Sequence, residues 1–389
     1  MTVRPSGPGW SPVRQSVELP AGVTRELLPL TAEDGAAFDG VLYQRPDRAP
    51  RVALVLMHPV ASFLHHYAAI PLAARGFAVL ALNSRFVSSE SELIVEEVAL
   101  DLAAGVAHLR ERGFERVVLM GNSAGGGLVA FYQAQAEHPT VRATPGGRPP
   151  DLTAARLPQA DALVILNAHR GRAQLLTAWL DPAVTDEQDP LATDPELDLF
   201  APGRTPPYDP AYVERYRAAQ EARNHRITAW VHERLARLEA ARVPDQAFTV
   251  HRTAADPRFL DLTLDPSERE PGASAGSDLR AANYAPAGLA RHASLHSWLS
   301  QWSLADSHVA AEANVARVSV PLLFLQGTAD QRIFPSDVRA VFDAARVDDK
   351  RLSWIPGGSH HFLDQPADRR MVVDLVEDWL AGRGMPARR

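Results

Sequence analysis

The chain has 389 residues, of which 46% are hydrophobic and 22% are charged, and it carries a formal net charge of −7. This composition is typical of a globular protein with a large buried core, and the negative net charge does not favour nucleic acid as a partner. Because the chain has no cysteine, disulfide bonds and a thiol nucleophile are excluded.

The N-terminal part of the chain alternates predicted strands with predicted helices. Residues 1–20 are rich in Pro and Gly and are expected to be irregular. They lack the apolar core of a signal peptide, and no stretch has the apolar length of a membrane helix, so we expect a cytoplasmic protein that does not use a membrane. The alternation itself is the pattern of a mostly parallel, doubly wound α/β sheet. The predicted elements are a strand–turn–strand over 24–43, strands over 51–57 and 77–82, and helices over 67–74 and 92–112.

The next predicted strand leads into the most informative motif of the chain. It begins near Arg116 and ends in G-N-S-A-G at 121–125, and a helix-like stretch follows directly. A G-x-S-x-G motif between a strand and a helix is the signature of a nucleophile elbow. The glycines on either side of Ser123 remove the Cβ atoms that would clash in so sharp a turn. The motif predicts Ser123 as a nucleophile, and the alternative is a Gly-rich connection whose serine merely caps the helix.

A strand predicted over 161–166 is followed by a long insertion, from about residue 171 to 308, that breaks the alternation. Asp209 and Pro210 are good N-terminal residues for a long helix over 212–242, and apolar residues recur at helical spacing within 289–304. We interpret the insertion as a mainly helical cap over the active-site edge. For its aromatic residues, packing in the cap's own core is the alternative to a role in the pocket. The residues expected to bind substrate are His58, Tyr212, Trp298 and Trp302.

An acid and a pair of histidines follow the last two predicted strands. The strand over 320–325 precedes Asp330, and the strand over 350–355 precedes His360 and His361. The carboxyl ends of parallel strands form the ligand edge of an open sheet, so we expect these side chains to lie near the predicted nucleophile. The doubled histidine leaves His361 as a rival of His360.

Taken together, these motifs resemble those of the α/β-hydrolase superfamily. G-N-S-A-G, G-T-A-D-Q-R-I-F-P and P-G-G-S-H-H-F match its nucleophile, acid and histidine loops in the expected order. The resemblance implies an α/β-hydrolase fold in which Ser123 is the nucleophile, Asp330 the orienting acid and His360 the base. It covers about residues 35–172 and 310–389. The expected division is a core made of 1–171 and 310–389, with a cap over 172–309.

The chemistry of ester cleavage explains why these residue types are needed. A serine hydroxyl needs a base to take its proton, and histidine titrates close to neutral pH. A carboxylate behind the imidazole fixes its tautomer. The tetrahedral intermediate also needs an oxyanion hole, for which the backbone N–H of Ala124 is one expected donor. Because Pro59 has no N–H, Val60 is the first candidate for the other donor, and Ala61 is the second.

The sequence therefore predicts a serine hydrolase that cleaves a small-molecule carboxylic ester through an acyl-enzyme. The same triad also serves amide, thioester or carbon–carbon bond hydrolysis, and a non-catalytic ligand-binding protein on this fold is a further alternative. No metal or other cofactor is expected, because no nucleotide-binding motif and no metal-ligand spacing is present. A homodimer is left open.

Overall fold

The computed structural model describes residues 19–272 and 278–387. The expectation of an irregular N-terminus falls almost entirely on residues 1–18, outside the described part of the chain. No helix within the described ranges is both long enough and apolar enough to cross a bilayer.

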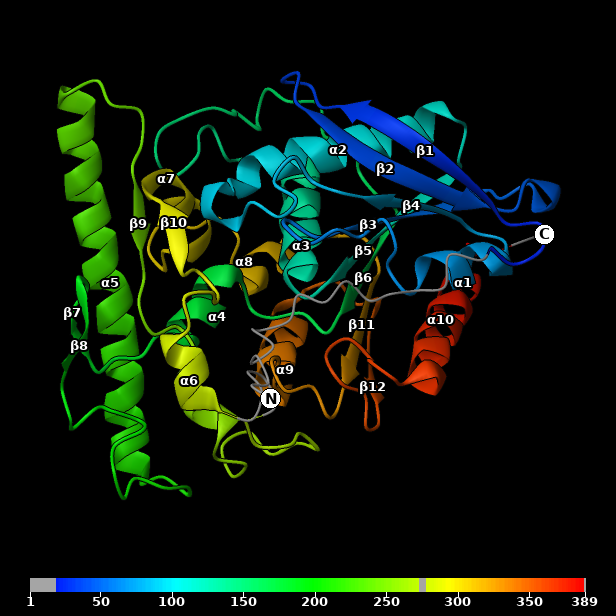
Figure 1. Ribbon diagram of the computed structural model, residues 1–389. Helices are drawn as coiled ribbons and strands as arrows, with labels where there is room; N and C mark the ends of the chain where they lie inside the picture. The colour runs from blue at the N-terminus through cyan, green and yellow to red at the C-terminus, as the bar shows by residue number, and fades with distance from the viewer. Residues whose placement is uncertain (1–18, 273–277, 388–389) are drawn as a thin grey trace, which may run out of the picture.

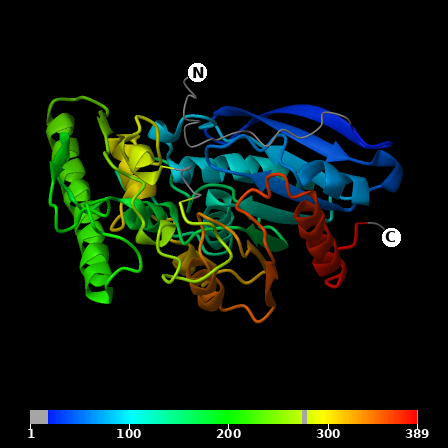
Figure 2. The same cartoon turned by 60° about the horizontal axis from the view of Figure 1, so that its bottom comes forward.

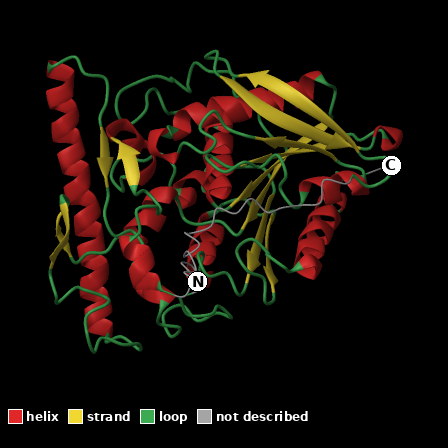
Figure 3. Ribbon diagram, viewed as in Figure 1, coloured by secondary structure: helices red, strands yellow, loops and turns green. Residues whose placement is uncertain are grey.

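An eight-stranded sheet forms the centre of the core (Figure 3). Its strands are β1 (Thr24–Thr31), β2 (Ala37–Gln44), β3 (Val52–Met57), β4 (Ala78–Leu82), β5 (Arg116–Asn122), β6 (Ala162–Leu166), β11 (Leu322–Gly327) and β12 (Lys350–Ile355). They lie in the order β1-β2-β4-β3-β5-β6-β11-β12, and all neighbours are parallel except β1 with β2 and β2 with β4. Every residue of β3, β4 and β6 is buried, as expected for parallel strands that are covered on both faces.

Helices cover both faces of this sheet (Figure 1). On one face, Leu102, Val129 and Val341 belong to one apolar cluster with the sheet, and on the other face Leu72 and Val373 belong to a second. Each helix therefore buries its apolar side against the strands, which is the driving force for this layered arrangement. The helices of the first face are α2 (Val95–Glu111), α3 (Ala124–Glu137), α8 (Ala311–Val315) and α9 (Pro335–Ala344), and those of the second are α1 (Ala69–Arg75) and α10 (Pro366–Ala381). Two short 3-10 turns, η1 (Pro46–Arg48) and η2 (Glu90–Glu92), lie in core loops.

The chain between β6 and α8 forms the inserted part. Its core joins residues of several elements, among them Leu176, Ile227 and Trp298. Figures 1 and 2 both place the longest helix, α5, at the edge of the molecule, away from the central sheet. The inserted elements are α4 (Arg172–Trp179), β7 (Val184–Asp186), β8 (Asp189–Thr193), α5 (Pro210–Ala240), β9 (Ala247–Thr249), η3 (Pro257–Phe259), α6 (Leu279–Tyr284), β10 (His292–Ser294), α7 (Leu295–Ser297) and η4 (Trp298–Trp302).

The long predicted helix is present as α5, and its start has the predicted cap. The Asp209 carboxylate accepts hydrogen bonds from the backbone N–H groups of Ala211 at 2.9 Å and Tyr212 at 3.1 Å. The stretch 289–304, whose apolar residues recur at helical spacing, is not helical throughout. His292–Ser294 instead pairs with β9 as an antiparallel strand, and helical structure begins at Leu295. The backbone of His292–Ser294 forms its hydrogen bonds with a strand more than forty residues away in the chain. Side-chain periodicity does not reveal such a partner.

Candidate active site

Ser123 lies in a sharp turn between β5 and α3, with φ 56° and ψ −123°. A Cβ atom on Gly121 would lie 2.1 Å from the carbonyl oxygen of Gly125, and one on Gly125 would lie 2.4 Å from that of Met57. Backbone meets backbone at both places, so only glycine fits there. A strained backbone at a single serine indicates a site where geometry matters more than local stability.

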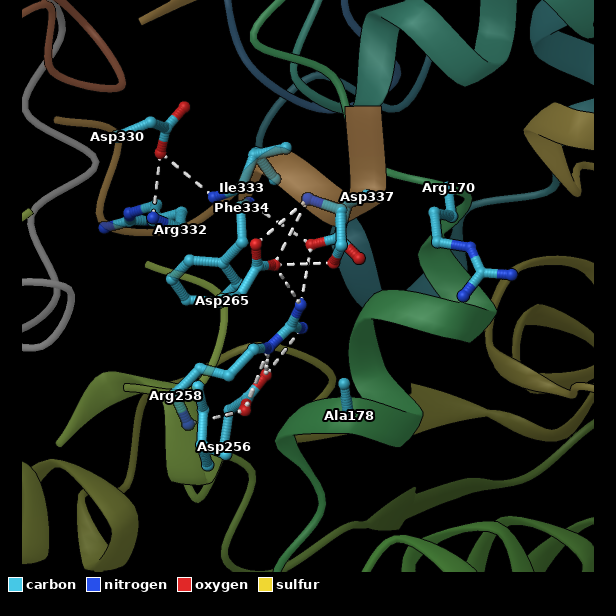
Figure 4. Close-up of polar contacts among 12 residues, drawn as sticks. Arg170, Ala178, Asp256, Arg258, Asp265, Asp330, Arg332, Ile333, Phe334 and Asp337 are labelled. Carbon is cyan, nitrogen blue, oxygen red and sulfur yellow. Dashed lines mark hydrogen bonds and ion pairs between the residues drawn. The ribbon is translucent and has the colours of Figure 1, made fainter. Parts of the chain in front are cut away.

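The acid and the histidine meet this serine from the loops after β11 and β12. His360 Nε2 lies 3.1 Å from Ser123 Oγ, and His360 Nδ1 lies 2.8 Å from Asp330 Oδ2. The backbone N–H groups of Arg332 and Ile333 donate to the other carboxylate oxygen of Asp330, at 2.8 and 3.0 Å (Figure 4). Both His360 and Asp330 are buried. The three side chains therefore form a continuous hydrogen-bonded chain.

Asn167, which the sequence analysis did not single out, joins the end of β6 to β11 and to the loop that carries His360. Its N–H donates to Leu325 O at 2.9 Å, and its side-chain Oδ1 accepts from Gly327 N at 2.8 Å. Its Nδ2 donates to His360 O at 2.9 Å. Asn167 has φ 43°, a conformation that Asn tolerates better than most residues. Its position directly after a buried strand is a local signal, but this signal is too common in loops to have identified it.

His361 packs against its neighbour instead of facing the serine. The rings of His360 and His361 meet edge to face with centroids 4.4 Å apart. Burial, followed by the charge fields of His360 and Arg332, lowers the pKa of His361 to about 2. Among the described residues, the imidazole that bonds to Ser123 Oγ is that of His360.

The expected oxyanion donors have different surroundings. Ala124 is the first residue of α3, so its N–H has no partner within the helix. The N–H groups of Val60 and Ala61 both point to His58 Nδ1, at 3.1 and 2.8 Å. His58 is buried, and burial followed by the charge of Arg172 lowers its pKa well below the usual range. Its ring is therefore neutral at pH 7 and accepts hydrogen bonds through Nδ1.

Two further buried groups, both missed in the sequence, share this environment. His169 accepts from Gly171 N through Nδ1 at 3.1 Å, and burial followed by the charges of Arg172 and His360 lowers its pKa to about 3. Arg172 forms an ion pair with Glu90. It also donates to Gln301 Oε1 at 2.7 Å and lies over the ring of Trp302, 4.2 Å from the centroid. The imidazoles of His58, His169 and His361 around His360 are therefore neutral at pH 7. The positive charge of Arg172 beside them is balanced by Glu90.

The aromatic residues expected to bind substrate, Tyr212, Trp298 and Trp302, lie in the interior of the inserted part. Tyr212 belongs to a cluster with Tyr208 and Tyr216, and Trp298 donates through Nε1 to Thr228 Oγ1 at 2.9 Å. Trp298 and Trp302 are fully buried in the larger cap cluster. Their surroundings are those of core side chains, which is the alternative that the sequence left open. Within the described ranges, no group of His, Asp or Glu has the arrangement of a metal site.

Comparisons with known proteins relate the C-terminal part of the chain to a hydrolase family model. Residues 286–367, which include Asp330 and His360 but not Ser123, match the Hydrolase_4 family model, described as serine aminopeptidase, S33. None of the curated proteins matches the sequence.

Two solved structures illustrate the likeness of the fold. A hypothetical protein, PA2218, from Pseudomonas aeruginosa is 14% identical with a TM-score of 0.54, over 93% of this chain and 96% of the other. The α/β hydrolase GrgF from Penicillium sp. sh18 is 13% identical with a TM-score of 0.53, over 92% of this chain and 98% of its own. The strand order, the elbow and these likenesses agree that the chain has an α/β-hydrolase fold.

Proposed function

We propose that the protein is a serine hydrolase that cleaves a carboxylic ester through an acyl-enzyme, with Ser123 as nucleophile, His360 as base and Asp330 as orienting acid. The observation that carries this proposal is the hydrogen-bonded chain from Ser123 Oγ to His360 at 3.1 Å and on to Asp330 at 2.8 Å. A nucleophile within hydrogen-bond reach of a base, with a third group orienting the base, is the arrangement that activates a serine.

In the proposed reaction, Ser123 Oγ attacks the ester carbonyl while His360 Nε2 takes the hydroxyl proton. His360 then returns this proton to the departing alcohol, and the acyl group remains on Ser123. Water enters, gives a proton to His360 and attacks the acyl carbon, which releases the acid and restores the serine. Asp330 keeps the proton of His360 on Nδ1, so that Nε2 is free to accept.

The Ala124 and Val60 N–H groups are proposed to stabilise the oxyanion. His58 Nδ1 has one lone pair, and it is shared between the N–H groups of Val60 and Ala61. The shorter bond, from Ala61 at 2.8 Å, is enough to satisfy this nitrogen. The Val60 N–H makes the longer bond, at 3.1 Å, so it can donate to a substrate oxygen instead at little cost.

The decisive experiment measures, for three variants, the turnover of a panel of aryl and alkyl esters and the labelling by a fluorophosphonate probe. Ser123→Ala should abolish labelling and lower ester turnover by at least about 10⁴-fold, as expected when a catalytic unit is broken. His360→Ala should have a comparable effect, whereas His361→Ala should keep turnover within about tenfold of the wild type, because its ring supports a neighbour and accepts no proton. Unchanged turnover in Ser123→Ala would reject the proposal.

Amide hydrolysis is the second candidate, because the matching family model is described as a serine aminopeptidase. The same nucleophile, base and acid would act, and the leaving amine would need the proton from His360. A panel of aminoacyl anilides and matched aminoacyl esters distinguishes the two. A higher kcat/KM for anilides than for the matched esters would favour the amidase.

A further inference from the structure

A segment of the cap lies against the two loops that carry Asp330 and His360. It comprises residues 256–272, includes η3, and is called the strap below. The backbone N–H of Glu268 donates to Thr328 O at 2.9 Å, which fixes the middle of the strap to the loop after β11. The end of the strap returns to its beginning, because Gly272 N donates to Phe259 O at 2.6 Å.

The Glu268 carboxylate bridges the two catalytic loops. Its Oε2 accepts hydrogen bonds from the Thr328 hydroxyl and, at 2.7 Å, from the backbone N–H of Gly357. Thr328 is two residues before Asp330, and Gly357 is three residues before His360. The hydrogen bond from Thr328, followed by that from Gly357, lowers the pKa of Glu268 below its ordinary value. One exposed carboxylate thus bridges the acid loop and the histidine loop, and it reinforces a direct hydrogen bond from Gly357 N to Thr328 Oγ1 at 2.8 Å.

A second anchor joins the strap to the start of α9, just after the acid loop. Figure 4 shows the Arg258 guanidinium between Asp256, Asp265 and Asp337. Arg258 lies 2.8 Å from the Asp256 carboxylate and 3.1 Å from that of Asp337. Asp265 accepts from the backbone N–H of Ser336 at 3.1 Å and from its hydroxyl at 2.5 Å. These contacts fix the strap relative to the loop without using Glu268.

The strap also holds its own shape. Arg269 is buried, and its guanidinium donates to the carbonyl oxygens of Asp265 at 2.6 Å and Leu264 at 2.7 Å. It also donates to Arg258 O at 3.0 Å and lies over the ring of Phe334. Because Arg269 and the second anchor define the strap, removing the exposed Glu268 side chain should leave the strap in place.

We propose that Glu268 is a positioning residue for the catalytic pair Asp330 and His360, a role that rests on the proposed function. Proton transfer from Ser123 requires two hydrogen bonds in series, and each depends on the relative position of two loops. Ala329 N to Gly358 O, at 3.0 Å, joins these loops from within the core. Glu268 adds the link from the cap side, so the cap contributes to the geometry of the base although the triad lies wholly in the core.

The test compares Glu268→Ala with Glu268→Gln and with the control Glu270→Ala. Glu270 is an exposed glutamate in the same strap, and no hydrogen bond from its carboxylate to either loop occurs among the described residues. Glu268→Ala should lower kcat by about 10- to 100-fold with KM within about twofold, since a misplacement of 1 Å costs up to about 10² in rate. Glu268→Gln should restore most of kcat, because its amide oxygen can accept from Gly357 N and its amide group can donate to Thr328 Oγ1. Glu270→Ala should match the wild type.

A readout that needs no turnover separates this proposal from the proposed function. In a Ser123→Ala background, NMR of ¹⁵N-histidine protein follows the low-field proton on His360 Nδ1 that bonds to Asp330. We expect Glu268→Ala to shift or broaden this resonance, and Glu270→Ala to leave it unchanged. If Glu268→Ala keeps the wild-type resonance and the wild-type kcat, the positioning role is overturned. The same holds if only the melting temperature falls while the resonance and kcat stay unchanged. Loss of the resonance on Glu268→Ala, together with a protein with intact Ser123 that hydrolyses no ester, would keep the positioning role and reject the proposed function.

Discussion

Replacing Asp330 with Asn tests whether this carboxylate fixes the tautomer of His360. The backbone N–H groups of Arg332 and Ile333 both donate to Asp330 Oδ1, at 2.8 and 3.0 Å. In Asp330→Asn, these two donors require the amide oxygen at that position. The amide NH₂ group then takes the place of Oδ2, 2.8 Å from His360 Nδ1. A donor at that position forces Nδ1 to accept, so the imidazole proton moves to Nε2 and faces Ser123.

An imidazole with its proton on Nε2 cannot take the proton of Ser123. The cost of a wrong tautomer in serine hydrolysis is about 10⁴ in kcat, or about 5 kcal/mol of transition-state stabilisation. Folding should be little affected. Gln326 Nε2 also faces Oδ2, at 3.2 Å, but Gln326 Oε1 is buried without a hydrogen-bond partner in the described part of the chain. A rotation of this amide can accept the new NH₂ group, but it gives up the bonds from Gln326 Nε2 to Gly327 O at 3.1 Å and to Ile333 O at 3.3 Å, so a loss of up to about 2 kcal/mol is expected.

The assay is steady-state hydrolysis of an activated ester, together with urea unfolding. Asp349→Asn is the matched control, because it makes the same chemical change at an exposed carboxylate paired with Arg383. We expect Asp349→Asn to keep wild-type kcat, and Asp330→Asn to lose about 10⁴-fold while its unfolding free energy changes by less than about 2 kcal/mol. A kcat of Asp330→Asn within tenfold of the wild type would refute the tautomer argument.

Two further predictions concern the elbow and the buried imidazoles. Gly125→Ala should lower the unfolding free energy by about 1–3 kcal/mol and kcat by about 10²-fold, because its Cβ would lie 2.4 Å from Met57 O. Gly127→Ala is the control, because its Cβ would lie 3.8 Å from Val309. It should keep activity and add up to about 1 kcal/mol of helix stability in urea unfolding. Equal kcat and equal unfolding free energy in the two variants would contradict the packing argument. Burial lowers the pKa of His66 to about 4 and that of His169 to about 3, against about 6.5 in the unfolded chain, so the unfolded state binds more protons below pH 6.5. Burial also lowers the pKa of His58 and that of His361, so four imidazoles contribute. Stability should be full above pH 6.5 and fall by roughly 5 kcal/mol per pH unit down to about pH 4, and His66→Gln should remove about a quarter of this slope in urea titrations at pH 4.5 to 7.5. An unchanged slope would show that His66 does not titrate in this way.

Local patterns carried most of what the sequence revealed about the core. The apolar run before Ser123 predicts a buried strand, and the flanking glycines predict the turn, because both depend on neighbours within a few residues. The strand order then places Asp330 and His360 at the same edge, since parallel strands end together. The chain alone did not distinguish His360 from His361, because adjacent residues of one loop differ only in which way the turn directs them.

The contacts that were missed join residues far apart in the chain. Asn167 bonds to the loop of His360, and Glu268 bonds to the loops of both Asp330 and His360. Neither residue has a local pattern that marks it, because an Asn after a strand and an exposed Glu are common in any loop. The side chain of His58 is another contact that the sequence could not predict. Its position fixes where the Val60 N–H points, and that depends on the turn after β3 and not on residue type.

The frame around the proposed triad is held by hydrogen bonds that use none of its three side chains. Ser123 N donates to Leu166 O at 3.0 Å, and Asn167 Oδ1 accepts from Gly327 N at 2.8 Å. Backbone bonds of this kind persist when a reacting side chain is replaced, because their donors and acceptors remain. Substitutions of Ser123 or His360 should therefore report on chemistry, and those of Gly125 should report on the frame. Glu268 belongs to neither class: it bonds to the frame from the cap, so its removal should alter kcat without unfolding the loops that it joins.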